Sequence, residues 1–421
     1  MNKVIALLGA LDTKGVEYKF VKECVERSGH RTLVIDVGII DPPHFVPDVC
    51  REEVARAVGA DISVLAKKQD RSEAVGAMSR GAAALLPKLH AEGRFDAVIA
   101  LGGTGGTSVA CAAMRNLPLG VPKVMVSTVA GGDVSGYVGI KDIVMIPSIV
   151  DVAGLNRISR EVFVRAAAIV CAMAETKVPA GQDKPVIVAS MFGNTTSAVN
   201  HAKELLDKQG YETLVFHCTG SGGRTMESLI QAGMVTGVLD ITTTEWADEL
   251  VGGVLTAGPT RLEAAARGGV PAIVVPGCLD MVNFWAPETV PAKFKDRKFY
   301  QHNPNVTLMR TNVEENQRLG IILAEKINLS AGPVTVLLPL RGLSMIDSAG
   351  GAFWWPEADQ ALFRAIKENL RSDIPVVEMD CVINDPIFAE TCVEHLLANI
   401  SLKQTTNNNQ TRVSAPKPVP A

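Results

Sequence analysis

Short apolar runs alternate along the chain with longer segments in which apolar residues recur every three or four positions. The short runs predict buried strands, and the longer segments predict helices. Strands are predicted at residues 4–8, 33–37, 97–101 and 124–126, and helices at residues 17–28, 51–60, 73–90 and about 156–175. Because strands and helices alternate, this half predicts an α/β fold with a doubly wound, mainly parallel sheet flanked by helices.

The alternation pauses at a polar segment and then restarts. Residues 176–184 contain Pro, Gly and charged side chains, which is typical of a linker. Further strands are predicted at residues 186–189, 213–216, 237–239, 272–275, 334–338 and 376–379. We therefore expect two domains of similar topology, residues 1–178 and 185–400. Residues 401–421 hold few apolar side chains and are predicted to be a disordered tail.

Composition narrows the class of protein. The 421 residues carry a net charge of −4, which argues against a general nucleic-acid binder. No apolar run approaches the roughly 18 residues that a membrane span needs. The eight cysteines include no C-x-x-C pair, which argues against a zinc ribbon. We therefore expect a cytoplasmic protein with reduced thiols that binds neither membranes nor nucleic acid.

The clearest chemical signal is a glycine-rich segment directly after the predicted strand at 97–101. Its residues are Gly102, Gly103, Thr104, Gly105, Gly106, Thr107 and Ser108. Glycines let backbone amides turn toward an anion, the following helix adds partial positive charge, and the hydroxyls add donors. The segment predicts a phosphate site, and the alternative is a tight turn that needs glycine only for packing. It is neither a Walker A loop nor a complete G-x-G-x-x-G.

Side chains near other strand ends of the first half complete a candidate nucleotide site. Asp12, Thr13 and Lys14 lie between the first strand and the first helix, where Lys can meet a phosphate and Asp a metal or a hydroxyl. Asp36 ends the second strand, a position that often binds a ribose hydroxyl. Ser127 follows a later strand and is predicted to line the same cleft. Capping of a helix or loop is the alternative role of both aspartates.

The second half contains another glycine-rich loop before a predicted helix. The candidate substrate-binding residues are Gly220, Ser221, Gly222, Gly223 and Arg224 in this loop, with Thr243 and Asn283 after later strands. An arginine at a helix start can bind a carboxylate or phosphate through two hydrogen bonds. Because the carboxyl ends of parallel strands share one edge of the sheet, we expect these groups to gather at one active site.

Four side chains of the second half are candidates for catalysis. They are His217, Glu245, Asp280 and His302. The histidine and carboxylate groups can act as acid or base, and the carboxylates can also bind magnesium. A satisfied core histidine is the alternative for His217, and a helix cap is the alternative for Glu245 and Asp280.

Several of these segments together resemble a family of ATP-binding proteins that includes the amino-terminal region of the tomato tobamovirus-resistance protein and bacterial two-domain proteins. The matching segments are LDTKG at 11–15, GGTGGT at 102–107, HCTGSGGRTME at 217–227, TTTE at 242–245 and PGCLDMVNF at 276–284. The resemblance covers about residues 1–400. It implies two Rossmann-like domains, ATP binding at the 102–107 loop, a homodimer, and a separate TIM-barrel protein as a partner. It implies no catalytic mechanism.

Three functions are open at this point. An ATP-dependent enzyme acting on a small carboxylated or phosphorylated metabolite is favoured by the two ligand-type loops, with ATP and magnesium as candidate cofactors. A non-catalytic module, in which ATP controls a dimer that docks a partner protein, is favoured by the missing Walker lysine. A nicotinamide or sugar-nucleotide enzyme rests on analogy of fold alone.

Overall fold

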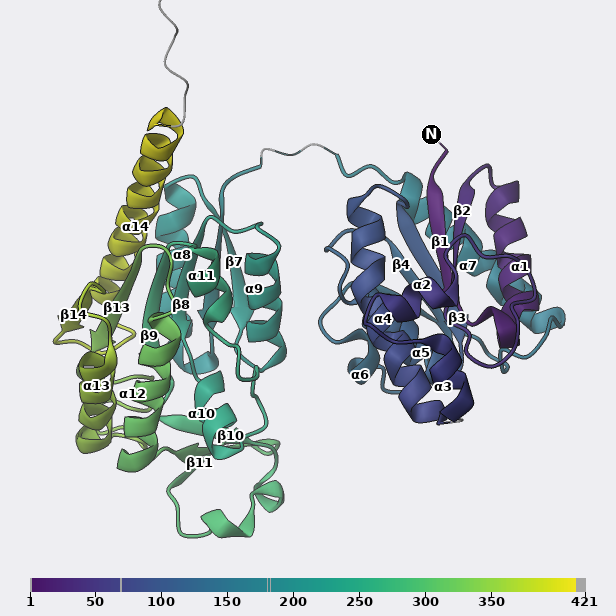
Figure 1. Ribbon diagram of the computed structural model, residues 1–421. Coiled ribbons are helices and arrows are strands. Elements are labelled where there is room, and N and C mark those ends of the chain that lie inside the picture. Colours follow the sequence, from purple (N-terminus) through teal and green to yellow (C-terminus); the bar gives the residue numbers. More distant parts are fainter. Residues whose placement is uncertain (1, 69, 180, 182, 414–421) are drawn as a thin grey trace, which may run out of the picture. The chain divides into compact units, whose positions relative to one another are not determined.

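The chain folds into two compact units, residues 1–180 and 181–421. The computed structural model describes residues 2–68, 70–179, 181 and 183–413 (Figure 1). The division falls inside the polar segment at 176–184. Within the described ranges, no helix combines the length and the apolar content that crossing a membrane requires.

The first unit contains a sheet of five parallel strands in the order β2-β1-β3-β4-β5. The strands are β1 (Val4–Gly9), β2 (Arg31–Asp36), β3 (Ala97–Gly102), β4 (Lys123–Ser127) and β5 (Ile143–Pro147). The chain passes from β1 outward to β2 and then returns past β1 to β3. The order of connections therefore reverses between β1 and β3, and this reversal is the topological switch point where such sheets bind ligands.

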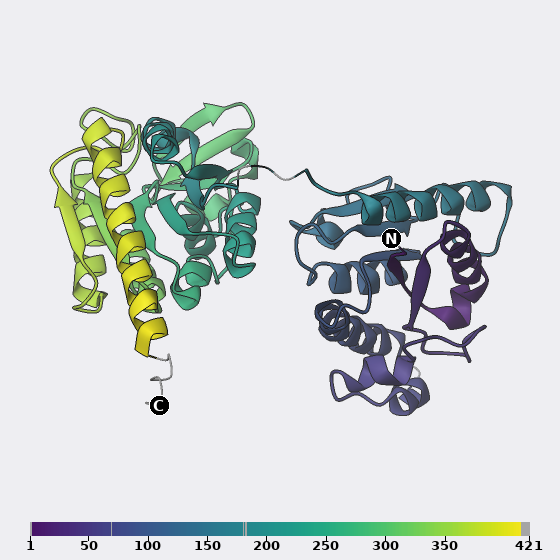
Figure 2. The same ribbon diagram turned by 90° about the horizontal axis from the view of Figure 1, so that it is seen from above.

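Helices cover both faces of this sheet (Figure 2). The helices are α1 (Leu11–Arg27), α2 (Arg51–Arg56), α3 (Ile62–Lys68), α4 (Arg71–Ala91), α5 (Thr104–Met114), α6 (Ser135–Val138) and α7 (Arg157–Glu175). Ile5 and Leu7 of β1 pack with α1 and α7, whereas Ala6 and Leu8 pack with α2, α4 and α5. Both faces are buried, which is why these strands appear in the sequence as continuous apolar runs.

The second unit repeats this topology with one more strand. Its six parallel strands have the order β14-β13-β9-β8-β6-β7, so that β7-β6-β8-β9-β13 matches the first sheet. The strands are β6 (Val186–Met191), β7 (Glu212–His217), β8 (Gly237–Thr242), β9 (Ala272–Gly277), β13 (Val334–Pro339) and β14 (Val376–Met379). The predicted fold class, α/β with two mainly parallel sheets flanked by helices, is confirmed.

Helices also cover both faces of the second sheet. Those on one face are α8 (Thr196–Lys208) and α14 (Pro386–Val413). Those on the other are α9 (Ser221–Gln231), α10 (Glu245–Val251), α11 (Glu263–Gly268), α12 (Val313–Ile327) and α13 (Pro356–Asn369). The second unit also contains three short 3₁₀ turns, η1 (Gly193–Thr195), η2 (Pro287–Thr289) and η3 (Ala292–Phe294).

The second unit also carries a small antiparallel sheet that the sequence analysis did not predict. It consists of β10 (Met281–Phe284), β12 (Val306–Arg310) and β11 (Phe299–Asn303), in that spatial order. The strands are only four or five residues long, and β11 is largely polar and exposed. Such strands lack the apolar run by which the longer strands are recognised.

The prediction of a disordered tail at 401–421 is wrong for its first part. Residues up to 413 continue α14, and residues 414–421 lie outside the described part of the chain. Leu396 and Ile400 are buried in the core and anchor the preceding turns of this helix. Extending a formed helix costs far less than nucleating one, so a polar segment with few apolar residues can follow as helix.

Candidate functional site

A cavity of about 640 Å³ opens beside the carboxyl ends of β1 and β3 in the first unit. It therefore lies at the topological switch point. Its walls come from the loops after β1 and β3, the segment at 37–40 after β2, and the helices α3, α4 and α5. Small-molecule pockets span roughly 300–1,000 Å³, so this cavity has the size of a ligand site.

The N-terminus of α5 opens on this cavity. The helix begins at Thr104, and no described side chain caps it at Gly103. Amides of the first turn have no partner within a helix and carry the positive end of its dipole. A Cβ atom on Gly105 would meet no described atom within 4 Å, whereas one on Gly102 would lie 3.1 Å from Gly106 Cα. Gly102 thus serves packing, and Gly105 leaves space in the cavity wall.

The hydroxyls of this loop mostly face the protein. The buried Thr107 Oγ1 donates to Gly103 O at 2.8 Å and lies 2.7 Å from Ser127 Oγ. Ser108 Oγ donates to Thr104 O, one turn earlier, at 3.0 Å. Of the loop hydroxyls, Thr104 lines the cavity, whereas Thr107 and Ser108 do not. Ser127, at the end of β4, was predicted to line the same cleft and is not among the lining residues either.

Asp12, Thr13 and Lys14 all line the cavity. Asp12 Oδ2 accepts hydrogen bonds from Ile39 N at 2.9 Å and Ile40 N at 2.8 Å. Its Oδ1 is buried and has no hydrogen-bond partner among the described residues. Asp12 therefore fastens the segment at 37–40 to the first turn of α1, and so shapes one wall of the cavity.

The charged lining of the cavity is mainly acidic. Asp12, Asp70 and Asp151 contribute three carboxylates, and Lys14 contributes one ammonium group. A polyphosphate in this space would be repelled by the excess carboxylate charge unless a cation accompanied it. Among the described side chains, no group of three or more His, Cys, Asp or Glu residues could hold a metal ion by itself.

Asp36 has the capping role rather than the predicted ribose contact. It is fully buried and does not line the cavity. Its Oδ1 accepts from Leu11 N at 3.0 Å and from Gly38 N at 2.8 Å, and its burial raises the pKa of the carboxyl. The residue joins the end of β2 to the start of α1.

Tyr18 is a cavity residue that the sequence analysis missed. It is fully buried on α1 and its hydroxyl lies between β1 and β3. A Cβ atom on Gly9 would lie only 1.9 Å from the tyrosine ring, so this contact requires glycine at the end of β1. Tyr18 lies at a core-facing position of a predicted helix. From the sequence, a tyrosine at such a position cannot be told apart from one that only packs in the core.

The glycine-rich loop of the second unit is closed by a carboxylate of the chain itself. Glu245 Oε1 accepts hydrogen bonds from Gly220 N at 2.8 Å and Gly223 N at 3.1 Å, at the N-terminus of α9. A Cβ atom on Gly223 would lie 2.0 Å from Glu245 Oε2. Glu245 is 1% exposed. The place that a bound anion would take is therefore filled.

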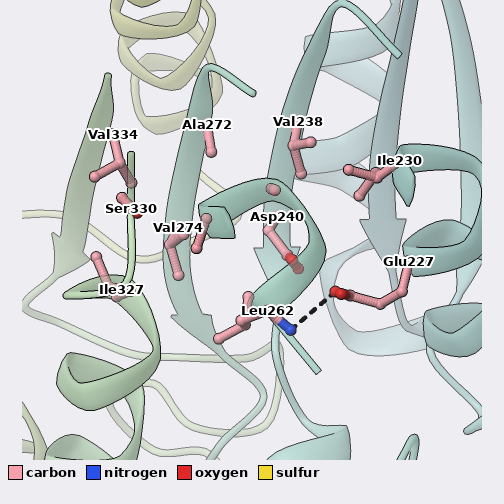
Figure 3. Close-up of a pocket in the computed structure, with 12 residues that line it drawn as sticks. Glu227, Ile230, Val238, Asp240, Leu262, Ala272, Val274, Ile327, Ser330 and Val334 are labelled. Atoms are coloured by element: carbon pink, nitrogen blue, oxygen red, sulfur yellow. Dashed lines mark hydrogen bonds between the residues drawn. The ribbon is translucent and has the colours of Figure 1, made fainter. Parts of the chain in front are cut away.

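Glu245 belongs to a buried network around Arg261. Arg261 Nε donates to Glu245 Oε2 at 2.8 Å, and its two terminal nitrogens bind the Asp240 oxygens at 2.6 and 2.7 Å. Glu227 also pairs with Arg261, at 3.3 Å, and accepts from Leu262 N at 2.8 Å. Glu227 and Asp240 line a void of about 10 Å³, which has room for about one water. Figure 3 shows these two side chains among the lining residues. This network links α9, β8, α10 and the segment before α11.

The remaining loop residues of the second unit lie around this network. Ser221 and Arg224 are exposed. Gly222 packs against the backbone of His217, where a Cβ atom would lie 1.8 Å from the His217 carbonyl oxygen. The His217 side chain is exposed, with its ring centre 5.4 Å from that of Phe192. His217 is thus at the surface and is not a buried core histidine.

The other candidates do not gather at one open site. Asp280 is fully buried, accepts from Ser344 Oγ at 2.9 Å, and has its pKa raised by burial and by the neighbouring Asp347. His302 is exposed on β11. The structure therefore separates the candidates into buried pairs and surface groups.

Thr243 and Asn283 are also buried and bound within the fold. Thr243 Oγ1 donates to Val275 O at 3.1 Å. Asn283 Nδ2 donates to Asp248 Oδ2 at 2.7 Å, and its backbone N donates to Asp248 Oδ1 at the same distance. Neither side chain is placed to receive a substrate in this conformation.

The two units coincide with two domains of one protein family. Residues 3–179 match the N-terminal domain of the uncharacterised protein family UPF0261, and residues 184–400 match its C-terminal domain. The chain belongs to the UPF0261 family. A UPF0261 protein of Clostridium tetani is 50% identical over 399 residues, which cover 94% of this chain and 99% of that protein.

The tomato relatives that the sequence analysis pointed to are found as well. The ToMV resistance protein Tm-1(GCR237) of Solanum lycopersicum is 41% identical over 421 residues, covering 93% of this chain and 55% of that protein. Among solved structures, a UDP-N-acetylglucosamine 2-epimerase from Rickettsia bellii aligns over 98% of this chain and 99% of its own, with 11% identity and a TM-score of 0.24. A TM-score this low carries no argument about ligand or reaction.

Proposed function

We propose that the first unit of this UPF0261 protein binds ATP in the cavity beside β1 and β3. The proposal rests above all on the uncapped N-terminus of α5, which opens on a cavity of about 640 Å³ at the switch point. Anionic phosphate is stabilised by free amides and by the dipole at a helix N-terminus. The resemblance described for the sequence, which implies ATP binding at the 102–107 loop, supports the same ligand.

The two ends of the cavity suit the two ends of a nucleotide. Gly103, Gly105 and Lys14 offer amides and a cation at the polar end. Other lining residues are apolar and can cover a base; they are Val37, Ile39, Ile40, Leu65, Ala74, Val75, Val109 and Ala110. The phosphates would bind at the N-terminus of α5, and the base would lie against apolar lining residues away from it, such as Ile39, Leu65 and Val75.

The acidic lining makes binding dependent on a divalent cation in this proposal. Mg²⁺ commonly binds through one or two protein carboxylates together with the phosphates of the nucleotide. Asp12 and Asp151 line the cavity and would supply such contacts only together with bound phosphates. Affinity for ATP should therefore fall when magnesium is removed.

The closed loop of the second unit helps to choose between an ATP-dependent enzyme and a module that ATP controls. An ATP-dependent enzyme with its substrate at residues 220–224 would need that loop open, but Glu245 fills it. This observation favours the second candidate, a module in which ATP controls docking of a partner protein. A homodimer and a TIM-barrel partner are part of this proposal.

Calorimetry with ATP, with and without magnesium, tests the proposed site. Gly105→Val adds a side chain where no described protein atom lies within 4 Å, so the fold should survive and ATP binding should be lost. Gly136→Val is the matched control, because a Cβ atom there is equally unhindered and Gly136 does not line the cavity. Equal ATP affinity of the two variants would contradict the proposed site, and no binding by the wild type would overturn the function.

A further inference from the structure

β1 and β3 pair over three residues and then part. The paired residues run from Ile5 with Ala97 to Leu7 with Ile99. The ends that part, from Leu8 and from Ala100 onward, lead directly into the two loops that line the cavity. Two parallel strands that separate leave backbone donors and acceptors that a direct ladder no longer satisfies.

The hydroxyl of Tyr18 lies in the fork, which is the gap that opens between β1 from Leu8 onward and β3 from Ala100 onward. It accepts from Leu101 N at 2.7 Å and donates to Leu8 O at 2.6 Å, with Leu101 O at 3.0 Å as a second acceptor in reach. An N–H donor of β3 is thereby linked to a carbonyl of β1 through one oxygen atom. The hydroxyl takes the place of a ladder bond and spans a wider gap than a ladder bond can.

We propose that Tyr18 is the positioning residue of the ligand site, because its hydroxyl sets the separation of the β1 and β3 loops. The inference rests on the proposed function for the identity of the ligand, ATP. The role of Tyr18 in the separation of the two loops does not depend on it. Tyr18 also belongs to α1, whose first turn carries Asp12 and Lys14 into the cavity. One side chain thus links three walls of the site: the ends of β1 and β3 and the start of α1.

Gly9 is the second half of this arrangement. Because a Cβ atom at residue 9 would lie 1.9 to 2.2 Å from ring atoms of Tyr18, any side chain there must displace the ring. Displacing the ring removes the hydroxyl from the fork. Gly9 and Tyr18 should therefore act as one unit in binding, with strongly non-additive effects when both are changed.

The second unit bridges its fork differently. β6 and β8 also pair over three residues, ending at Ala189 and Leu239. There Ser190 Oγ accepts from Thr242 N at 2.8 Å and donates to Asp240 Oδ1 at 2.7 Å. This short side chain ties the strand end to the buried Arg261 network, and no tyrosine takes part. The tyrosine bridge is thus a feature of the unit that holds the cavity.

Tyr18→Phe tests the proposal, because it keeps the ring and removes the hydroxyl. Measured at a temperature where the variant is folded, its ATP dissociation constant in magnesium should rise roughly tenfold, the effect of losing a buried hydrogen-bond bridge. Amide hydrogen exchange should accelerate in the segments 8–14 and 100–107, which include the ends of β1 and β3 and the starts of α1 and α5. Tyr211→Phe is the control, since that half-buried tyrosine lies in the second unit. A lower melting temperature with unchanged affinity and exchange would reduce Tyr18 to a purely structural role and overturn the proposal.

Gly9→Ala and the double variant Gly9→Ala/Tyr18→Phe complete the cycle. Gly9→Ala should weaken ATP binding at least as much as Tyr18→Phe does. The double variant should bind ATP as tightly as Gly9→Ala alone. Additive losses would contradict the shared arrangement. If the wild type does not bind ATP, the proposed function fails, and the hydrogen-exchange measurement still decides the role of Tyr18.

Discussion

The two glycine-rich loops of this protein look alike in sequence and differ in structure. Each follows a parallel strand and leads into a helix of 11 residues whose N-cap residue is a glycine. The first loop follows β3 at the switch point, and its helix start opens on a cavity. The second follows β7, one strand away from its switch point, and Glu245 occupies its helix start.

This difference shows what glycine content alone does not predict. Glycine lets a loop approach an anion closely, but the anion can be a carboxylate of the same chain. In the second unit, Glu245 follows the switch-point strand β8 and binds the loop after β7, two strands away. An open anion site therefore needs both a glycine loop and the absence of such a carboxylate from the other loops at the same sheet edge.

Removing the carboxylate that closes the second loop should have the largest effect. Glu245→Ala leaves Arg261 Nε and the amides of Gly220 and Gly223 without their partner in a buried place. Loss of one member of a buried ion pair costs about 3–5 kcal/mol. All four tryptophans lie at or beyond residue 246, so tryptophan fluorescence in urea follows the second unit. A loss below about 1 kcal/mol, similar to that of Glu368→Ala, an exposed control on α13 of the same unit, would contradict the closed-loop account.

The pH dependence of stability should also separate the two units. Burial raises the pKa of Asp248 and of Asp359 to about 7, and Asp347 adds to the shift of Asp359. The folded state then holds these protons more tightly than the unfolded state. Their stabilising contribution is full below about pH 4 and is lost as the pH rises through about 7, by roughly 2–4 kcal/mol per group at most.

Asp248→Asn is the variant that checks this pH dependence. Tryptophan fluorescence should show the second unit of the wild type becoming easier to unfold between pH 5 and 8. The variant should show a flatter profile, whereas the exposed control Asp380→Asn should match the wild type. A wild-type stability that rises over this pH range would contradict the burial of protonated carboxyls.

The smallest expected effect concerns the first loop. Ser108→Ala removes a hydroxyl that donates to a carbonyl of its own helix. We expect the ATP dissociation constant to stay within about twofold and the stability within about 0.5 kcal/mol, because this exposed bond adds little to the helix. A large loss of ATP affinity in calorimetry would show instead that Ser108 turns toward the phosphates, as the sequence analysis expected.

Much of the fold could be predicted because its signals are local. The strands of both parallel sheets have apolar runs, and β5 was missed although its sequence, IVMIP, is such a run. The loop at 102–108 is recognisable by its four glycines between a strand and a helix. The cavity position follows from the strand order, since β1 and β3 meet at the switch point. The contacts of Asp12, Thr13 and Lys14 with the cavity follow from the same reasoning.

The parts that could not be predicted depend on distant pairs of residues. Glu245 meets Gly220 across 25 residues, and Tyr18 meets Leu101 across 83. The residues around Glu245 in the sequence do not show whether its carboxylate binds backbone amides of the same chain or acts in catalysis. The helix at 401–413 depends on Leu396 and Ile400, which anchor it in the core. In each case tertiary packing decides the role of a residue.

Hydrogen exchange of the whole protein with and without magnesium ATP tests the central claim most directly. The account predicts that ATP slows exchange at residues 9–14, 37–40 and 102–108, which line the cavity or begin α5, and leaves exchange at 220–224 unchanged. Protection at 220–224, or no protection at 102–108 under saturating ATP, would contradict the claim that the first unit holds the open nucleotide site and the second a closed one.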